Sequence, residues 1–290
     1  MQTVPAKRRS LRKRIAIATA VIAAMLVLSL ALVPVIAPMF LYLPTHDEDA
    51  RQSLLANPDI EPLTVESSGA ALTGYFLHGS DDAAPLVLYF NGNHENASAC
   101  MQALVTTPER LAPFAGCHFA QIDYPSYGLS AGEPSADAYR AMALDVYDAL
   151  AERADVTEII VLGYSIGTGP AHYCAAHRPV SGLILFAPYA SGVDLFNNIV
   201  PVFYGPLEGL VCYDMPSAEY ADDIAVEPII FATPDDHLVP YESTQSLLSL
   251  YPAGYKLVTV PDIDHGGFWG SAMVMTAVEG YIDERTAQED

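Results

Sequence analysis

The sequence predicts an α/β fold with a mostly parallel central sheet and helices on both faces, preceded by a membrane-spanning helix. Two patterns in the 290-residue chain lead to this class. Short apolar runs alternate with segments of helical periodicity, as expected of parallel strands joined by right-handed crossovers. Ahead of them, residues 15–37 form an uncharged, apolar run of 23 residues, long enough to cross the hydrocarbon core of a bilayer.

Charge divides the chain into two unequal parts. Residues 1–14 hold six bases and no acid, whereas residues 15–290 hold seven bases and 35 acids, a formal charge of −28. This acidic body excludes a nucleic-acid-binding protein, because such affinity comes from neutralising phosphates. The hydrophobic share of 51% excludes a disordered acidic tail.

The N-terminal region is interpreted as a basic cytoplasmic tail (1–14) and a transmembrane signal anchor (15–42). Bases before the apolar run and acids after it predict a cytoplasmic N-terminus, with the remaining domain on the outer, periplasmic or extracytoplasmic side. Pro34 and Pro38 are expected to bend or end the helix. The alternatives are a buried core helix, which leaves the bases unexplained, and a cleaved signal peptide. Signal-peptide apolar regions are shorter, and Ala37, the best-placed small residue, precedes a proline.

Residues 43–60 are interpreted as a polar connector and residues 61–285 as one globular domain. Its first two predicted strands, Leu63–Glu66 and Leu72–Leu77, form an antiparallel pair. Six further apolar runs predict strands, most of them buried on both faces of a parallel sheet. These runs are Leu86–Phe90, Phe119–Asp123, Ile159–Gly163, Leu183–Phe186, Ile229–Ala232 and Lys256–Val260.

Helices are predicted between several of these strands. Ser135 is a predicted N-cap, and apolar residues recur at helical spacing from Tyr139 to Leu150. Two further helices are predicted at Thr244–Leu250 and Phe268–Glu284. This alternation supports the α/β class.

A candidate nucleophile lies in the pentapeptide Gly163-Tyr164-Ser165-Ile166-Gly167, between a predicted strand and a predicted helix. In that context G-x-S-x-G is a nucleophile elbow, a strained turn that exposes the serine oxygen at the end of the sheet. Side chains at Gly163 and Gly167 would collide with neighbouring elements. The helix N-terminus behind the oxygen favours developing negative charge. An ordinary Gly/Ser turn is the alternative.

A serine nucleophile needs a base, and the base needs an orienting acid, here in the order Ser, acid, His. Asp236 follows a predicted strand and is the chosen acid, with Asp235 as the second candidate; plain turn residues are the alternative for both. His265, in a Gly-rich loop after the last predicted strand, is the predicted base. Most other histidines break the order, and His237 adjoins the acid too closely to face it.

The predicted oxyanion hole consists of two backbone N–H groups. One belongs to Ile166, directly after the nucleophile, and the other to Asn93 in the loop after the third predicted strand, where Gly92 lets the backbone turn. Losing one such donor costs about 3–4 kcal/mol of transition-state stabilisation. Although His94 and Glu95 follow, no second ligand pair at metal spacing exists, so neither a metal nor a cofactor is predicted.

With these motifs in order, the chain resembles serine hydrolases of the α/β-hydrolase superfamily. More narrowly, it is similar to a single-pass membrane branch often described as prolyl-aminopeptidase-like. The resemblance spans residues 60–285 and implies the α/β-hydrolase fold. It rests on Asn91-Gly92-Asn93, the Asp123–Pro134 loop, the Ser165 elbow, Asp236 before Val239-Pro240, and His265-Gly266.

One position departs from the family pattern. Members usually have His-Gly where this chain has Asn91-Gly92. Since that histidine usually supports the loop rather than reacting, the departure concerns the shape of the pocket more than its chemistry. The loop from Tyr127 to Gly132 is expected to shape the pocket wall.

Residues 188–227 form an insert, which we expect to be a small lid over Ser165. Its aromatic and mostly uncharged composition suits an acyl or alkyl group, and plain packing of short helices is the alternative. The aromatic residues include Phe196, Phe203, Tyr204, Tyr213 and Tyr220.

The four cysteines do not fix a disulfide pattern. An exported domain can form disulfides, and four cysteines allow three pairings, but free, buried thiols are favoured. These residues are Cys100, Cys117, Cys174 and Cys212.

The sequence therefore predicts a membrane-anchored serine hydrolase that cleaves carboxylic esters or thioesters through Ser165, His265, Asp236 and an acyl-enzyme. The expected partners are a small-molecule or lipid-like acyl substrate and the bilayer, with no nucleic acid and no obligate protein partner. An aminopeptidase-like peptidase is one alternative. A non-catalytic binding protein is another, motivated by the missing loop histidine.

Overall fold

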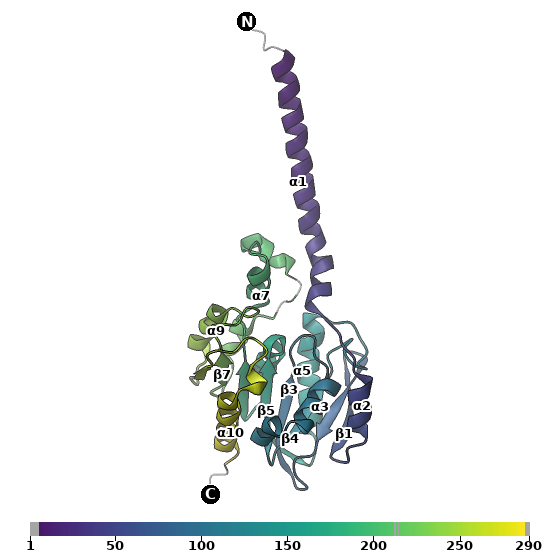
Figure 1. Ribbon diagram of the computed structural model, residues 1–290, viewed down its shortest axis with the longest axis vertical. Helices are drawn as coiled ribbons and strands as arrows, with labels where there is room; N and C mark the ends of the chain where they lie inside the picture. The colour runs from purple at the N-terminus through teal and green to yellow at the C-terminus, as the bar shows by residue number, and fades with distance from the viewer. Residues whose placement is uncertain (1–5, 212, 214, 288–290) are drawn as a thin grey trace.

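The computed structural model describes residues 6–211, 213 and 215–287, and it places an eight-stranded sheet between two layers of helices (Figure 1). The strands are β1 (Ile60–Ser67), β2 (Ala70–Leu77), β3 (Ala84–Phe90), β4 (His118–Ile122), β5 (Val156–Tyr164), β6 (Gly182–Phe186), β7 (Ile229–Ala232) and β8 (Lys256–Thr259). Each of the eight predicted strands is present, with ends within three residues of the prediction.

The sheet has the order β1-β2-β4-β3-β5-β6-β7-β8. β2 pairs antiparallel with both β1 and β4, and all later neighbours are parallel. The central strands β4 and β6 are buried along their whole length, which explains their continuous apolar runs. Because the parallel strands run the same way, the loops after β3, β5, β7 and β8 meet at one edge of the sheet.

Ten α-helices are described. They are α1 (Ala6–Leu41), α2 (Glu48–Leu55), α3 (Ala97–Thr106), α4 (Pro108–Leu111), α5 (Ala136–Ala151), α6 (Thr168–His177), α7 (Gly192–Ile199), α8 (Ser217–Ala221), α9 (Tyr241–Leu247) and α10 (Ala272–Thr286). Helices α5, α6, α8 and α9 pack on one face of the sheet, and α2, α3, α4 and α10 pack on the other (Figure 1). The α5 prediction is confirmed down to its cap, since the Ser135 Oγ accepts the Ala138 N–H at 3.0 Å.

Helix α1 leaves the domain at one end and is exposed over its apolar stretch (Figure 1). The stretch Leu11–Pro34 has a mean hydropathy of 2.7, so its length and composition suit a membrane span. The prolines do not end the helix: it continues through Pro34 and Pro38 to Leu41. A single proline removes only its own hydrogen bond and disturbs one carbonyl, and the neighbouring turns carry the helix on.

The expected connector is packed against the domain. It contains α2, whose N-cap Asp47 accepts the Ala50 N–H at 2.9 Å, and α2 lies against α3. Just before it, the buried Tyr42 ring contacts Tyr139 and Tyr213 edge-on, at centroid distances of 5.5 and 6.3 Å. The residue that directly follows helix α1 is therefore already packed in the domain.

The insert 188–227 has a buried part and an exposed part. Tyr189, Phe203 and Tyr213 are buried in the core. Helix α7 and the 3-10 turn Gly205–Leu210 lie beside α1, with Tyr204 exposed, and we call this part of the insert the lid. Among the described cysteines, Cys100, Cys117 and Cys174 are free thiols, whereas Cys212 lies outside the described residues.

Candidate active site

The candidate nucleophile lies on a sharp turn where β5 passes into α6. Ser165 has a φ of +53°, a left-handed conformation that non-glycine residues rarely adopt. A Cβ on Gly163 would lie 2.7 Å from the Ala171 Cβ, and a Cβ on Gly167 would overlap the Phe90 carbonyl oxygen. Both glycines are therefore required sterically, as the motif predicts.

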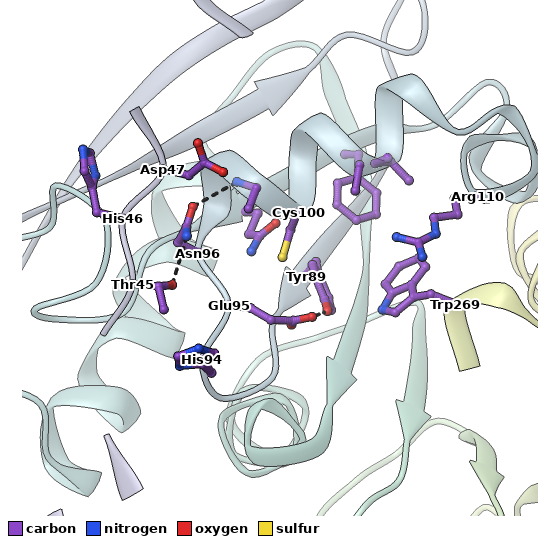
Figure 2. A pocket seen from close by; sticks show the side chains of 15 residues that line it. Thr45, His46, Asp47, Tyr89, His94, Glu95, Asn96, Cys100, Arg110 and Trp269 are labelled. Carbon is purple, nitrogen blue, oxygen red and sulfur yellow. Dashed lines mark hydrogen bonds between the residues drawn. The ribbon is translucent and has the colours of Figure 1, made fainter. Parts of the chain in front are cut away.

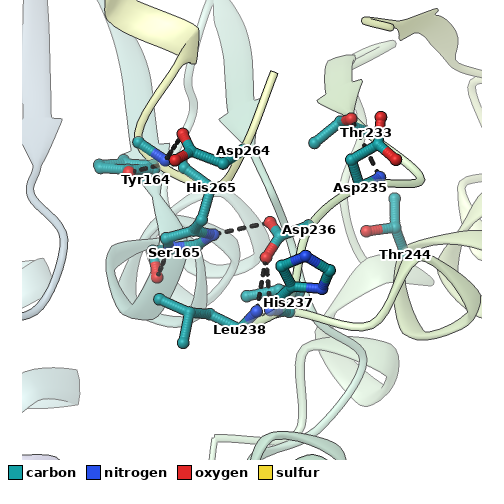
Figure 3. Close-up of polar contacts among 12 residues, drawn as sticks. Tyr164, Ser165, Thr233, Asp235, Asp236, His237, Leu238, Thr244, Asp264 and His265 are labelled. Atoms are coloured by element: carbon teal, nitrogen blue, oxygen red, sulfur yellow. Dashed lines mark hydrogen bonds and ion pairs between the residues drawn. The ribbon is translucent and has the colours of Figure 1, made fainter. Parts of the chain in front are cut away.

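Three side chains from three loops form a continuous chain of hydrogen bonds (Figure 3). The Ser165 Oγ lies 2.8 Å from the His265 Nε2, and the His265 Nδ1 lies 2.6 Å from the Asp236 Oδ2. A carboxylate at Nδ1 favours the tautomer with the proton on Nδ1, which leaves Nε2 free to accept the serine proton. This arrangement can generate a nucleophilic serine oxygen.

The second Asp236 oxygen is held by the backbone. The N–H groups of Leu238 and Val239 each donate to Asp236 Oδ1 at 2.8 Å. These bonds stabilise the ionised carboxylate and fix its direction. The neighbouring Asp235 is exposed and points away from His265, and His237 is exposed too (Figure 3). Of the two adjacent acids, the structure thus brings Asp236 to the histidine.

Tyr164 supports the histidine from the other side. Its hydroxyl donates to the His265 carbonyl oxygen at 2.8 Å, and its ring stacks on the imidazole at a centroid distance of 5.3 Å. Burial raises the pKa of Tyr164, so the phenol remains a donor at neutral pH. The sequence reasoning missed this residue, although it lies inside the elbow motif, because the variable position in G-x-S-x-G carries no signal.

The predicted oxyanion loop is held by two side chains that the sequence reasoning also missed. The Glu95 Oε2 accepts the Gly92 N–H at 2.7 Å, and the Tyr127 hydroxyl donates to the Asn93 Oδ1 at 2.8 Å. Burial raises the pKa of Glu95. The loop from Tyr127 to Gly132, which we expected to shape the pocket wall, does not itself line the cavity at Ser165 and acts on it through this contact with Asn93.

Asn91, at the position where the proteins that the chain resembles usually have histidine, lies beneath this loop. It is 1% exposed and does not line the cavity at Ser165. Its amide nitrogen donates to the Gly92 carbonyl at 2.9 Å, and its oxygen accepts from the Gln121 Nε2 at 3.1 Å. The asparagine therefore supports the loop with an amide in place of an imidazole.

The carbonyl group of Ile166 is held by two tyrosines of the insert 188–227. The hydroxyls of Tyr189 and Tyr213 donate to the Ile166 carbonyl oxygen at 3.1 and 3.0 Å. Asn93 and Ile166, the two predicted oxyanion residues, line the same cavity as Ser165. Both predicted oxyanion residues therefore lie beside the candidate nucleophile.

The cavity beside Ser165 has a volume of about 340 Å³ and is mostly apolar. Helix α7 contributes Leu195, Phe196 and Ile199, and the acid loop contributes Leu238 and Val239. The remaining wall includes Leu43, two residues after α1, whose N–H donates to the Tyr127 hydroxyl at 2.8 Å. The segment 43–60, which the sequence predicted to be a connector, therefore contributes its first residue to the pocket wall.

A second cavity of about 370 Å³ lies beside the loop after β3, and His94 of that loop lines both cavities (Figure 2). Its lining includes Glu95, Cys100, Arg110 and Trp269, but neither Ser165 nor His265. In the described part of the chain, no group of three or more His, Cys, Asp or Glu side chains is placed to hold a metal ion.

Asp123 is a buried carboxyl just after β4, 3% exposed. Its Oδ1 accepts the Ala97 N–H at the first turn of α3, at 2.6 Å. Burial raises the pKa of Asp123 to about 7 because the charged form loses its hydration. This carboxyl links the β4 loop to the helix that follows the oxyanion loop.

No protein-family model matches the chain. Among curated proteins, the chain is 28% identical over 193 residues to the uncharacterized protein Rv2307c of Mycobacterium tuberculosis, a match that covers 66% of each chain and thus just under two thirds of that relative. It is 25% identical to YfhR of Escherichia coli, covering 81% of this chain and 82% of YfhR. It is 22% identical to human ABHD12B, covering 70% and 62%.

Solved structures share the architecture at low sequence identity. The Pyrococcus furiosus esterase Pf2001 aligns with a TM-score of 0.67 and 14% identity, covering 85% of this chain and 99% of the esterase. Est1E from Butyrivibrio proteoclasticus, solved with ferulic acid bound, aligns with a TM-score of 0.63 and 19% identity, covering 78% and 100%. These likenesses identify the fold.

Proposed function

The chain has the α/β-hydrolase fold, and from this premise we propose that it is a serine hydrolase that cleaves carboxylic esters or thioesters. The observation that carries the proposal is the hydrogen-bonded chain from Ser165 through His265 to Asp236. The strained elbow and its two sterically required glycines support it further, because such strain is usual at catalytic sites.

The reaction follows from this arrangement. His265 Nε2 accepts the proton as Ser165 Oγ attacks the carbonyl carbon, and Asp236 stabilises the resulting imidazolium. Backbone N–H groups of Asn93 and Ile166 stabilise the oxyanion. The tetrahedral intermediate then expels the alcohol or thiol, which takes the proton from His265. Water, deprotonated by His265, attacks the acyl-enzyme, releases the carboxylic acid and restores the serine.

The lining of the cavity favours an ester over an aminopeptidase substrate. An aminopeptidase must hold a free α-ammonium group, and a carboxylate is the usual partner for it. The described residues around the cavity include no Asp or Glu, and most are aliphatic or aromatic. Among the structures with the same fold, Pf2001 is described as an esterase and Est1E binds ferulic acid. Both descriptions agree with the proposal of an ester substrate.

We further propose that α1 is a signal anchor with its N-terminus in the cytoplasm and the catalytic domain on the outer face. The support is the length of the exposed apolar helix together with the six bases that precede it. A non-catalytic role has less support, because Asn91 sustains the loop where the usual histidine is missing.

The test uses a fluorophosphonate probe on the full chain in mild detergent. Wild type should be labelled, and Ser165→Ala should lose labelling and on the order of 10⁶ in turnover, as when a triad serine is removed from subtilisin. Ser249→Ala, an exposed serine elsewhere, is the matched control and should keep both. Equal labelling of wild type and Ser165→Ala would exclude the proposed nucleophile.

A second measurement separates the substrate classes. Hydrolysis rates are compared for p-nitrophenyl esters of graded chain length and for aminoacyl-nitroanilides. The apolar cavity predicts faster cleavage of the esters, with a preference for chains that fill it. Faster cleavage of the anilides would favour the peptidase alternative.

A further inference from the structure

The lid carries an apolar face that no described residue covers. The exposed fractions are 76% for Ile199, 47% for Val200, 43% for Val202 and 61% for Tyr204. We call these four residues the outer lid face. No charged residue occurs between Asp194 and Glu208, so the segment that forms this surface carries no charge. Exposed apolar clusters of this kind usually mark an interaction site.

The outer lid face lies at the end of the domain from which α1 departs (Figure 1). The 3-10 turn Gly205–Leu210, which follows directly, contacts α1. Between Ile15 and Leu41 the helix is uncharged and about 40 Å long at 1.5 Å per residue. A bilayer with its headgroups is about 40–45 Å thick. The end of α1 therefore emerges near the outer headgroup level, beside the lid.

The packing of the connector keeps the lid at that level. Tyr42 is buried between Tyr139 and Tyr213, so no free linker separates the domain from α1. The cavity at Ser165 also extends to this end of the domain, because its wall includes Leu43 and the α7 residue Ile199. Ile199 thus belongs both to the cavity wall and to the outer lid face.

We infer that the outer lid face inserts into the bilayer crossed by α1 and that the substrate is an acyl lipid taken laterally from the outer leaflet. The contact is apolar rather than electrostatic, since residues 188–227 contain no Lys or Arg to attract anionic headgroups. The inference about the substrate rests on the proposed hydrolase function, whereas the inference about insertion rests on the proposed membrane anchor and not on the hydrolase function.

Insertion is tested with the full chain in phosphatidylcholine nanodiscs. The natural chain has one tryptophan, Trp269, so Val202→Trp adds a second emitter on the outer lid face. Brominated acyl chains should quench the added emission. Met273→Trp is the matched control, because Met273 is 52% exposed on α10, away from α1, and its added emission should not be quenched. No quenching for Val202→Trp overturns the inference.

Lateral supply of substrate is tested by activity. The variant carrying Val200→Glu and Val202→Glu places two charges on the outer lid face without altering the cavity lining. The ratio of its rate on a bilayer-embedded acyl ester to its rate on a soluble short-chain p-nitrophenyl ester should fall about tenfold. Met273→Glu should leave that ratio unchanged. An unchanged ratio in the lid variant rejects lateral supply.

The two proposals fail in different ways. If Ser165→Ala hydrolyses both esters as fast as wild type, the serine-hydrolase function fails, while quenching at Val202→Trp still reports bilayer contact. If Ser165→Ala is inactive and quenching is absent, the function holds and the inference of insertion is wrong.

Discussion

The edge of the sheet and the lid beside it are built in opposite ways. At the edge, Gly163 and Gly167 leave no space for a methyl group, and both Asp236 oxygens accept hydrogen bonds. In the lid, Gly192 is the sole buried residue described in α7, and apolar side chains face outward. The difference indicates that close packing positions the candidate catalytic groups, whereas the surface that we propose meets substrate and bilayer is constrained by few contacts.

The largest expected effect, on kcat, compares two adjacent acids: Asp236, which is buried and bonded to His265, and Asp235, which is exposed. Asp236→Asn should lower kcat by about 10⁴, because an amide favours the wrong tautomer of His265, as in the Asp-to-Asn variant of a serine protease. Asp235→Asn, in the same loop but exposed, should stay close to wild type. Ester hydrolysis by both variants measures this, and an equal loss in the Asp235 variant would remove the distinction.

A smaller effect, on stability, compares a glycine of the sheet edge with one of the lid. Gly167→Ala should reduce the free energy of unfolding by about 4 kcal/mol or more, because the added methyl group overlaps the Phe90 carbonyl. Gly209→Ala, in the turn Gly205–Leu210, meets no atom within 4 Å and should change it by less than about 0.5 kcal/mol. Urea unfolding of the full chain in mild detergent gives both values. Similar values would contradict the contrast in packing.

A still smaller effect concerns the buried Asp123. Its folded pKa of about 7 exceeds the ordinary value of 3.8, so the folded state binds more protons than the unfolded state between these values. Stability from this group is therefore fully present below pH 4 and is lost as pH rises through 7, by about 2–3 kcal/mol between pH 5 and 8.

Asp123→Asn keeps an acceptor for the Ala97 N–H and should flatten the dependence of unfolding free energy on pH. Urea unfolding at several pH values, with wild type as the reference, makes the comparison. A slope identical to that of wild type would show that Asp123 stays ionised in the fold.

Local pattern was sufficient for the strands and for much of the candidate site. Apolar runs between turns located all eight strands, and Ser135 marked the start of α5. Chain order singled out Ser165, Asp236 and His265, which the structure brings within hydrogen-bonding distance. The strands and the cap depend on neighbours along the chain, so the sequence records them directly, whereas the three site residues were found through the chain order Ser, acid, His.

The local pattern was misleading where distant segments determine the outcome. The prolines at 34 and 38 suggested a bend in the helix or its end, and α1 continues past both of them to Leu41. The polar composition of residues 43–60 suggested a connector, yet Leu43 lines the cavity, and Tyr42, the last residue of the predicted anchor, is buried in the domain. Helical bonds from neighbouring turns explain the first case, and packing against Tyr139 and Tyr213 explains the second.

The sequence by itself determined the α/β class, the apolar N-terminal helix and the identity of the nucleophile, acid and base candidates. Only the tertiary structure decided that Tyr164 holds the His265 loop, that Glu95 holds Gly92 and that the outer lid face lies beside α1. The reason is physical. Periodicity and motif spacing describe residues close along the chain, whereas a hydrogen bond such as the one from Tyr164 to His265 joins residues 101 positions apart.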